Sequence, residues 1–241
     1  MIGSIDPFVE KTYAADNIDD LRQFCVDFFL SSGLEMVSYH HLPPPGATDY
    51  DSNITVAAYG YPEEWVRIYL ERKYFEVDPI PKRALDSAFP FWWSEIENES
   101  NLTEEERLFL QALAKADLGE GLAIPVFGPH GRNGYAGLGF GKKNVALSVA
   151  DIASLQWACQ LGHQRYVYLL RAQAPEDVTL SKRETEILEW VARGKSNPVI
   201  AEIIGISTYT VDTYLRRIYG KLDVSDRVTA ALRGLATGLV A

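Results

Sequence analysis

Cysteine is scarce in this sequence, and the two that occur among its 241 residues, Cys25 and Cys159, lie far apart. Neither has a His or Cys neighbour at the spacing of a metal site, so we expect two reduced, buried thiols and no bound metal. Long apolar runs are also missing, because no window reaches the roughly 18 uninterrupted apolar residues of a membrane-spanning helix. The first residues, MIGSIDPFVEK, lack the basic and apolar runs of a signal peptide. The sequence therefore predicts a cytoplasmic protein with no membrane partner.

Positive charge is in short supply over most of the chain. The total is 23 Lys and Arg against 33 Asp and Glu, for a net charge of −10. Residues 178–241, however, hold nine basic and seven acidic side chains. Because salt screens phosphate attraction within about 8 to 10 Å, an acidic chain can still bind nucleic acid through one locally basic module. The C-terminal quarter is therefore considered separately.

The hydropathy pattern favours two domains. Helical periodicity covers about residues 17–31, 62–74, 103–116 and 148–171, and strands are expected at about 34–42, 53–59, 121–127 and 135–140. The last two strands are joined by a glycine-rich run and form a predicted hairpin. We expect an N-terminal domain over 1–172, a linker over 173–178 and a helical domain over 179–241. The fold class is α+β, with an N-terminal α-β-α sandwich around an antiparallel sheet and a C-terminal four-helix domain.

Residues that start and stop helices divide the C-terminal segment into four short helices. These signals are, in chain order, the capping box Ser181–Glu184, the helix-ending Gly194, the helix-starting Pro198, the tight-turn Gly205 and the N-cap Ser207. The third helix then carries a buried stripe of Val211, Leu215, Ile218 and Leu222. A small Ala201 lets the second and third helices cross closely. Periodicity alone leaves open a helix pair that enters a DNA groove or a plain helical hairpin.

A specific set of residues decides between these alternatives. It consists of Leu180, Ser181, Arg183-Glu184, Glu186, Leu188, Gly194-Lys195-Ser196-Asn197, Ile200-Ala201, Ile206-Ser207, Thr210-Val211, Lys221-Leu222 and Val224. In this pattern the segment resembles the helix-turn-helix DNA-binding domain of the LuxR family of bacterial transcription factors. On the third helix, Arg216 and Arg217 can reach guanine edges or phosphates, Thr210 and Lys221 can contact phosphates, and Thr213 shares the exposed surface.

The same resemblance extends to assembly. In such proteins the fourth helix, here about 225–239, often pairs two DNA-binding domains, so a homodimer on a two-fold symmetric DNA site is implied. RNA polymerase is a further candidate partner. Two positions depart from the family: Asp212 stands where a basic or amide residue is usual, and Tyr214 where a His is usual. An acidic Asp212 beside DNA would repel phosphate.

An aromatic and acidic constellation lies in the N-terminal domain. Tyr61, Trp65 and Tyr69 are four residues apart, so a helix would align their rings on one face. Aromatic stripes usually belong to the core, but Asp78 follows closely, and a carboxyl buried among rings costs several kcal/mol unless it meets a donor. Asp78 therefore needs a partner. Pro79, Trp93 and Gly121 complete the pattern.

These residues resemble the acyl-homoserine lactone binding domain of quorum-sensing LuxR-family members. The resemblance implies that Trp65 donates to the lactone carbonyl, Asp78 accepts from the amide N–H and Tyr61 donates to the amide carbonyl, with Tyr69 and Trp93 as walls. An expected hydroxyl residue falls at about Gly137, which is thus a candidate ligand contact, and another falls at Ile80. Both side-chain hydroxyls are missing, which favours an unusual acyl group. The rings Phe91, Trp92 and Tyr135 could line an aryl or short branched acyl pocket.

Alternative functions find less support. A phosphoacceptor receiver would need an acidic pair after a first strand, which Asp19-Asp20 does not provide, and a parallel sheet. An enzyme would need a nucleophile elbow, a metal spacing or a Ser/His/Asp set, and none is present. His40 and His41 are adjacent on a predicted strand, so they point to opposite faces and are structural. The sequence therefore favours a regulator without a cofactor. Its ligand is expected to be an acyl-homoserine lactone or, as the alternative, a non-lactone small molecule. The sequence leaves open whether ligand promotes or releases DNA binding.

Overall fold

The computed structural model describes residues 5–49, 56–143, 146–172 and 178–241. The chain divides into two compact units: the first comprises residues 1–42, 54–128 and 133–173, and the second comprises 43–53, 129–132 and 174–241. Within the described ranges, no helix is both long and apolar enough to cross a membrane, and no three His, Cys, Asp or Glu side chains gather as a metal site. The predicted linker at 173–178 lies outside the described residues except for its last one.

The first unit is built on a five-stranded antiparallel sheet with the order β2-β1-β5-β4-β3. The strands are β1 (Met36–Leu42), β2 (Val56–Tyr59), β3 (Phe91–Trp92), β4 (Gly121–Val126) and β5 (Asn133–Gly139). The 3-10 helix η3 (Pro129–Gly131) connects β4 to β5, which pair as the predicted hairpin. The antiparallel sheet is confirmed, and it excludes the parallel sheet of a receiver.

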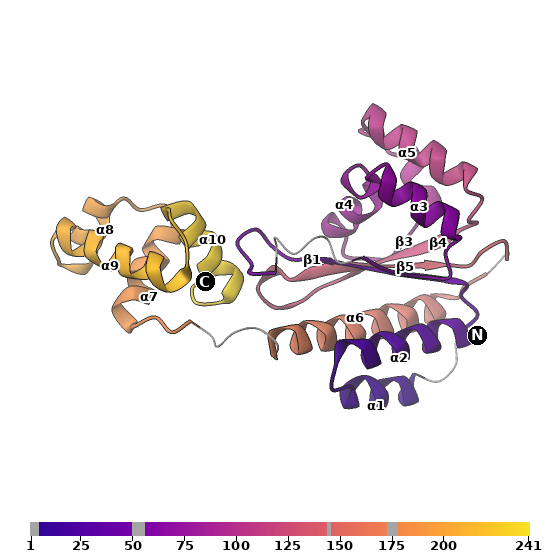
Figure 1. Cartoon of the computed structure of the whole chain (residues 1–241), viewed down its shortest axis with the longest axis horizontal. Coiled ribbons are helices and arrows are strands. Elements are labelled where there is room, and N and C mark those ends of the chain that lie inside the picture. Colours follow the sequence, from indigo (N-terminus) through magenta and orange to yellow (C-terminus); the bar gives the residue numbers. More distant parts are fainter. Residues whose placement is uncertain (1–4, 50–55, 144–145, 173–177) are drawn as a thin grey trace. The chain divides into compact units, whose positions relative to one another are not determined.

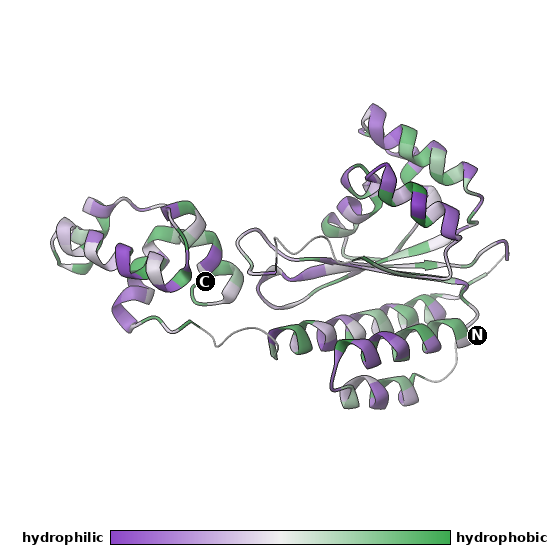
Figure 2. Cartoon of the chain, in the orientation of Figure 1, coloured by the Kyte–Doolittle hydropathy of each residue, from purple (hydrophilic) through white to green (hydrophobic). Residues whose placement is uncertain are grey.

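Helices cover both faces of this sheet. They are α1 (Asp6–Ala14), α2 (Ile18–Ser31), α3 (Glu63–Glu71), η1 (Tyr74–Glu76), α4 (Pro79–Asp86), η2 (Trp93–Asn98), α5 (Glu104–Lys115) and α6 (Val149–Ala172). Figure 1 shows α1, α2 and α6 on one face and α3, α4 and α5 on the other. The predicted α-β-α sandwich is therefore confirmed. Hydrophobic and hydrophilic residues alternate along the helices of both layers, as expected for helices that bury one side (Figure 2).

Two separate cores follow from this layering. On the α1, α2 and α6 side, Ile124 and Leu138 pack with Phe29 and Leu155. On the α3, α4 and α5 side, Ala123, which precedes Ile124 on β4, and Tyr135 of β5 pack with Trp65 and Phe109 of the helices. Alternate strand residues point to opposite faces, so one strand contributes to both cores. Every residue of β4 is buried for this reason.

The second unit contains the helices α7 (Lys182–Ala192), α8 (Asn197–Ile204), α9 (Thr208–Leu222) and α10 (Arg227–Thr237). The capping box of Ser181 and Glu184 is present, and Ser207 caps α9 by accepting from the Thr210 backbone N–H. Gly205 takes a φ of 70° in the turn between α8 and α9, a left-handed conformation that a glycine adopts freely. The predicted stripe of α9 is buried with Ile187, Leu188 and Ile200 from the neighbouring helices. The four-helix domain is confirmed.

Candidate functional site

The carboxyl group of Asp78 lies between η1 and α4 and has two intramolecular donors. Its Oδ1 accepts from the Ile80 backbone N–H at 2.9 Å, which caps α4, and its Oδ2 accepts from the Tyr69 hydroxyl at 3.0 Å. Burial raises the pKa of Asp78 to about 7, and these two hydrogen bonds oppose the rise. Asp78 therefore has the partner that the sequence required, and its carboxyl changes charge near neutral pH.

Three further hydroxyl groups, those of Ser38, Tyr61 and Tyr135, are hydrogen-bonded to one another, and the two tyrosines interact with the Asp78 charge. Tyr61 donates to Ser38 Oγ at 3.3 Å, and Tyr135 also forms a hydrogen bond with Ser38. Burial raises the pKa of Tyr61 to about 12, and the charge of Asp78 adds to that rise. Burial also raises the pKa of Tyr135, again with a contribution from Asp78. We call this set, Ser38, Tyr61, Tyr69, Asp78 and Tyr135, the Asp78 cluster.

Ser38 supplies a hydroxyl beside the position where the sequence showed none. Ser38 on β1 is the register partner of Gly137 on β5. A Cβ added to Gly137 would lie 2.6 Å from Ser38 Oγ and 2.6 Å from the Tyr135 hydroxyl oxygen. Gly137 thus leaves room for a hydroxyl that comes from the neighbouring strand. Sequence reasoning missed Ser38, because pairing the predicted strands 34–42 and 135–140 leaves their register open, and the register decides which residue lies opposite Gly137.

Two tryptophans border the Asp78 cluster. Trp65 is buried, and its ring lies 6.1 Å from that of Tyr69 and 6.3 Å from that of Phe109. Trp93 is also buried, and its Nε1 has no hydrogen-bond partner among the described residues. A buried N–H without an acceptor is costly, so an acceptor on a bound molecule would stabilise Trp93. Tyr61 precedes α3 instead of lying on it, yet it packs in the same core as Trp65 and Tyr69.

The structure separates the three rings expected to line an acyl pocket. Phe91 and Tyr135 belong to the core around the Asp78 cluster. Trp92 packs on the opposite face of the sheet, with its ring 5.9 Å from that of Phe140. The expectation for Trp92 is wrong, because it follows Phe91 on β3 and consecutive strand residues point to opposite faces. His40 and His41 diverge for the same reason, His40 toward Tyr135 and His41 toward Tyr166.

Gly121 makes room for the indole of Trp93. A Cβ at Gly121 would lie 2.5 Å from three atoms of that ring. We expect Gly121→Ala to displace Trp93 and to lower the free energy of unfolding by about 1–3 kcal/mol, the usual cost of overpacking. Urea unfolding followed by tryptophan fluorescence measures this change. The matched control is Gly220→Ala, where nothing lies within 4 Å, so equal midpoints for the two variants would contradict the packing described here.

The exposed surface of α9 carries the predicted DNA contacts. Arg216 and Arg217 are exposed, and the Arg217 guanidinium lies 5.7 Å from the centre of the Tyr214 ring. Thr210 Oγ1 is hydrogen-bonded to Ser207 Oγ at 2.8 Å, and Thr213 donates to the Tyr209 carbonyl of its own helix. The two arginines thus stand free of salt bridges within the described residues.

Lys221 and Asp212 have intramolecular partners. The Lys221 ammonium lies 2.7 Å from the buried carboxylate of Glu184 and 3.2 Å from the Thr179 carbonyl oxygen, so it ties α9 to the start of α7. The Asp212 carboxylate accepts from the Asn197 side chain, whose oxygen in turn accepts from Arg227 at 2.7 Å. Asp212 thus joins α9 to α8 and, through Arg227, to α10.

Comparison with known proteins identifies two domains in the chain. Residues 17–166 match the autoinducer binding domain, and residues 178–233 match the bacterial regulatory proteins of the luxR family. The quorum sensing-dependent transcriptional regulator RpaR of Rhodopseudomonas palustris is 30% identical over 76% of this chain and 74% of its own. The transcriptional activator AnoR of Acinetobacter nosocomialis is 28% identical over 77% of this chain and 79% of its own.

A solved structure shares the fold. Escherichia coli SdiA superposes with a TM-score of 0.70 at 22% identity, covering 97% of this chain and 96% of its own. The relatives are transcriptional regulators, which confirms the expectation of a regulator over an enzyme. Two domain matches that together cover most of the chain establish the family. The chain belongs to the LuxR family of quorum-sensing transcriptional regulators, with an autoinducer-binding domain followed by a helix-turn-helix DNA-binding domain.

Proposed function

We propose that this regulator binds an N-acyl-homoserine lactone in the Asp78 cluster and, as a cytoplasmic homodimer, controls transcription at a two-fold symmetric DNA site. The domains are residues 1–172 for the ligand and 179–241 for DNA. The observation that carries the proposal is the buried cluster itself. It presents a carboxylate acceptor, Asp78, beside hydroxyl donors from Tyr61 and Tyr135. A dry pocket must match each polar group of an amide-lactone, which has one donor and several acceptors.

Each cluster residue has a role in this proposal. Asp78 accepts from the ligand amide N–H, Tyr61 donates to the amide carbonyl and Trp65 donates to the lactone carbonyl. Tyr69 and Trp93 wall the pocket, and the unpaired Trp93 Nε1 is an additional donor for a ligand oxygen. Gly137 provides the space that Ser38 Oγ borders. The aromatic rings of Phe91 and Tyr135 in the same core favour an aryl or short branched acyl group.

The DNA contacts are assigned to the exposed side of α9. Arg216 and Arg217 contact base edges or phosphates, while Thr210 and Thr213 contact the backbone beside them. An ammonium has three donors, and two of those on Lys221 are engaged, so the third is left for a phosphate. The apolar side chains Val228, Leu232 and Leu235 are exposed on α10 at helical spacing, which supports pairing of two DNA-binding domains. RNA polymerase is the proposed partner of the DNA-bound dimer.

A non-lactone ligand is the second candidate. Ser38 replaces the family hydroxyl near Gly137, so the group that faces the amide carbonyl differs from the family pattern. A solved structure of SdiA contains octanoyl-rac-glycerol, an acyl ester without a lactone ring. Such a ligand keeps the acyl carbonyl but has no amide N–H for Asp78. Binding that is equally strong for an acyl glycerol and a lactone of the same chain would favour this candidate.

Calorimetric titration of the full chain tests the proposal. The panel contains straight-chain, branched and aryl homoserine lactones, each paired with the matching acyl glycerol. We expect one lactone to bind with one site per chain. Ser38→Ala should weaken lactone binding by about tenfold, because it removes the hydrogen bonds of Ser38 with Tyr61 and Tyr135. The control is Ser154→Ala, an exposed hydroxyl on α6 that bonds only the Ala150 carbonyl. No saturable lactone binding would overturn the proposal.

The pKa of Asp78 makes ligand affinity depend on pH. Its pKa is raised from 3.8 to about 7, so in the free protein the carboxyl loses its proton as the pH passes through that upper value. The amide N–H of the ligand stabilises the charged form, so lactone affinity should rise between about pH 6 and pH 8. Calorimetry across this range measures the slope, with Asp78→Asn as the control that cannot ionise. Equal slopes in the two proteins would contradict the role of Asp78.

The same shift affects the stability of the free protein. Between 3.8 and about 7 the native chain retains a proton on Asp78 that the unfolded chain has released. The contribution of Asp78 to the free energy of unfolding therefore falls as the pH rises through this window. Ligand binding offsets this loss, since a ligand at a hundred times its dissociation constant stabilises the native state by about 2.7 kcal/mol.

A further inference from the structure

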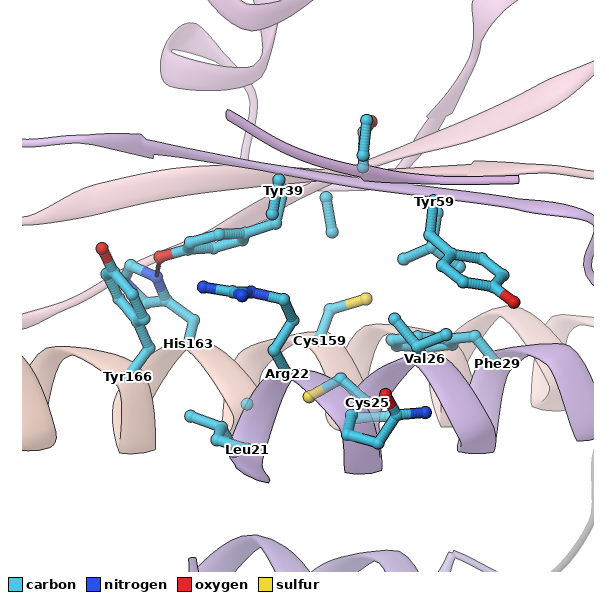
Figure 3. Close-up of a pocket in the computed structure, with 18 of the residues that line it drawn as sticks. Leu21, Arg22, Cys25, Val26, Phe29, Tyr39, Tyr59, Cys159, His163 and Tyr166 are labelled. Atoms are coloured by element: carbon cyan, nitrogen blue, oxygen red, sulfur yellow. Dashed lines mark hydrogen bonds between the residues drawn. The ribbon is translucent and has the colours of Figure 1, made fainter. Parts of the chain in front are cut away.

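A cavity lies on the face of the sheet that does not hold Tyr61, Tyr69 and Asp78. It is enclosed by α2 and α6 on one side and by β1, β2 and β5 on the other, with a volume of about 180 Å³ (Figure 3). Val26 and Phe29 of α2 and Val37 of β1 line its apolar part. The ligand site proposed above lies on the other face, and of the Asp78 cluster Ser38 alone is also among the residues that line this cavity.

Small side chains create this hollow. Ala57 on β2, Ala136 on β5, Ala158 and Gly162 on α6 all line the cavity. Gly162 closes the α6 side tightly, because a Cβ there would lie 3.1 Å from Cys25 Sγ. Ala57 is the register partner of Tyr39, whose ring lines the cavity, and directly paired residues of two strands share a face. The Ala57 methyl group therefore points into the cavity from an edge strand.

Tyr39, His163 and Arg22 form one polar end of the cavity, and the exposed Tyr59 lies at the other end (Figure 3). The Tyr39 hydroxyl and His163 Nδ1 are hydrogen-bonded at 2.8 Å, so neither requires a ligand. Arg22 extends from α2 toward this pair (Figure 3). Its partner Asp19 lies 3.0 Å away, but the two side chains are 54% and 85% exposed, so water and salt weaken their attraction. Arg22 can therefore pair with a second anion at the mouth of the cavity.

Cys25 and Cys159 both line the cavity from its helical side (Figure 3). Burial raises the pKa of the Cys25 thiol to about 12 and also raises that of Cys159. Both thiols are therefore protonated at neutral pH and act as small apolar groups instead of nucleophiles. The cavity is suited to reversible binding of an apolar group.

We propose that this cavity is a second ligand site, which binds a small aryl carboxylate with its ring among the alanines and its carboxylate on Arg22. A cavity of about 150 Å³ with an apolar lining is large enough to hold benzene, so the volume here fits one ring. The carboxylate then gains a charge-assisted hydrogen bond to the guanidinium group.

Titration of the full chain with benzoate tests this inference, with benzyl alcohol as the uncharged counterpart. We expect saturable binding of benzoate at one site per chain. Ala57→Leu, which fills the cavity, should weaken benzoate at least about tenfold, whereas Ala57→Ser should leave it within about twofold. Arg22→Gln should weaken benzoate but not benzyl alcohol, and Arg22→Lys should retain most of the binding. Arg22 is exposed, so its variants test the inference even if Ala57→Leu fails to fold.

Two results would overturn the inference. One is the absence of saturable benzoate binding up to about 10 mM. The other is binding that survives both Ala57→Leu and Arg22→Gln but is lost in Gly137→Ala, which would place benzoate in the Asp78 cluster instead. The two proposals can fail separately. If the wild-type chain binds no lactone but binds benzoate, and the Ser38→Ala variant still binds benzoate, the function proposed above fails while the second site is supported.

Discussion

Replacing Asp78 by Ala is expected to abolish the response of the regulator to its ligand. The variant removes the acceptor for the ligand amide N–H and leaves the Tyr69 hydroxyl without its partner. An unpaired buried polar group costs about 1–3 kcal/mol, so the unpaired ligand N–H corresponds to roughly a 5- to 150-fold loss of affinity, and the unpaired Tyr69 hydroxyl lowers the free energy of unfolding. Loss of the N-cap of α4 should add a decrease of about 1 kcal/mol in the free energy of unfolding. Calorimetric titration measures the ligand affinity, a transcriptional reporter measures the response to the ligand, and thermal unfolding measures the change in stability.

Asp78→Asn separates binding from stability. The side-chain oxygen of Asn still accepts from the Ile80 backbone N–H, so α4 keeps its cap. The neutral amide, however, is a weaker acceptor than a carboxylate for the ligand N–H. We expect near-normal thermal unfolding together with a ligand response that is at least about tenfold weaker. A normal ligand response in a folded Asp78→Ala protein would remove Asp78 from the binding site.

Arg216→Ala is expected to weaken operator binding by about 10- to 100-fold without changing ligand affinity. Arg216 is exposed on α9, and a bidentate contact from an Arg to guanine is worth about 1–3 kcal/mol. The loss should be smaller at a DNA site in which the contacted guanine is replaced, because the wild-type chain then gains nothing from that contact. Gel-shift titration with both DNA sites measures this difference.

Arg193→Ala is the matched control for charge. Arg193 is an exposed residue at the end of α7, and its guanidinium lies 4.9 Å from the centre of the Trp190 ring. Its loss changes the net charge of the domain as much as the loss of Arg216 does, but at the end of α7 instead of on α9. If both variants weakened operator binding equally, the effect would come from charge alone, and Arg216 would not contact a base.

The C-terminal domain could be predicted almost completely from the sequence because its signals are local. Ser181, Gly205 and Ser207 each fix a helix end through a backbone interaction within a few residues. The alternation that places Arg216 outside and Leu215 inside needs only the helical period. What the sequence could not give was the hydrogen bond from Asn197 to Asp212, which joins α8 to α9.

The N-terminal site could be predicted in part, and the missing part depends on strand pairing. Tyr61, Trp65 and Asp78 came from the family pattern, and the structure places them in one core or cluster. Ser38 was missed because only the register of β1 against β5 places it opposite Gly137. Trp92 was misplaced because β3 is a strand of two residues, too short to show an alternating pattern. The short helix α4 lies outside the helices predicted from periodicity, because its eight residues span little more than two turns.

The cavity between the sheet and the helices α2 and α6 lay beyond sequence reasoning for a different reason. A cavity depends on the volumes of many side chains from the sheet and from the helices that cover it. Ala57, Ala136 and Ala158 come from three different elements, and none of them alone indicates a cavity. Cys25 and Cys159 were expected only to be buried thiols far apart in the chain. Their meeting beside Gly162 follows from the packing of α2 on α6, which no local pattern encodes.

The central claim is that occupancy of the Asp78 cluster controls DNA binding by the C-terminal domain. The most direct test is the dissociation constant of the full chain for a two-fold symmetric operator selected from random DNA, with and without each lactone of the panel. We predict that one lactone changes operator affinity at least about tenfold in the wild-type chain and leaves Asp78→Ala unchanged. An increase identifies a ligand that promotes DNA binding, and a decrease identifies one that releases it. Operator affinity that stays the same with every lactone would contradict the account.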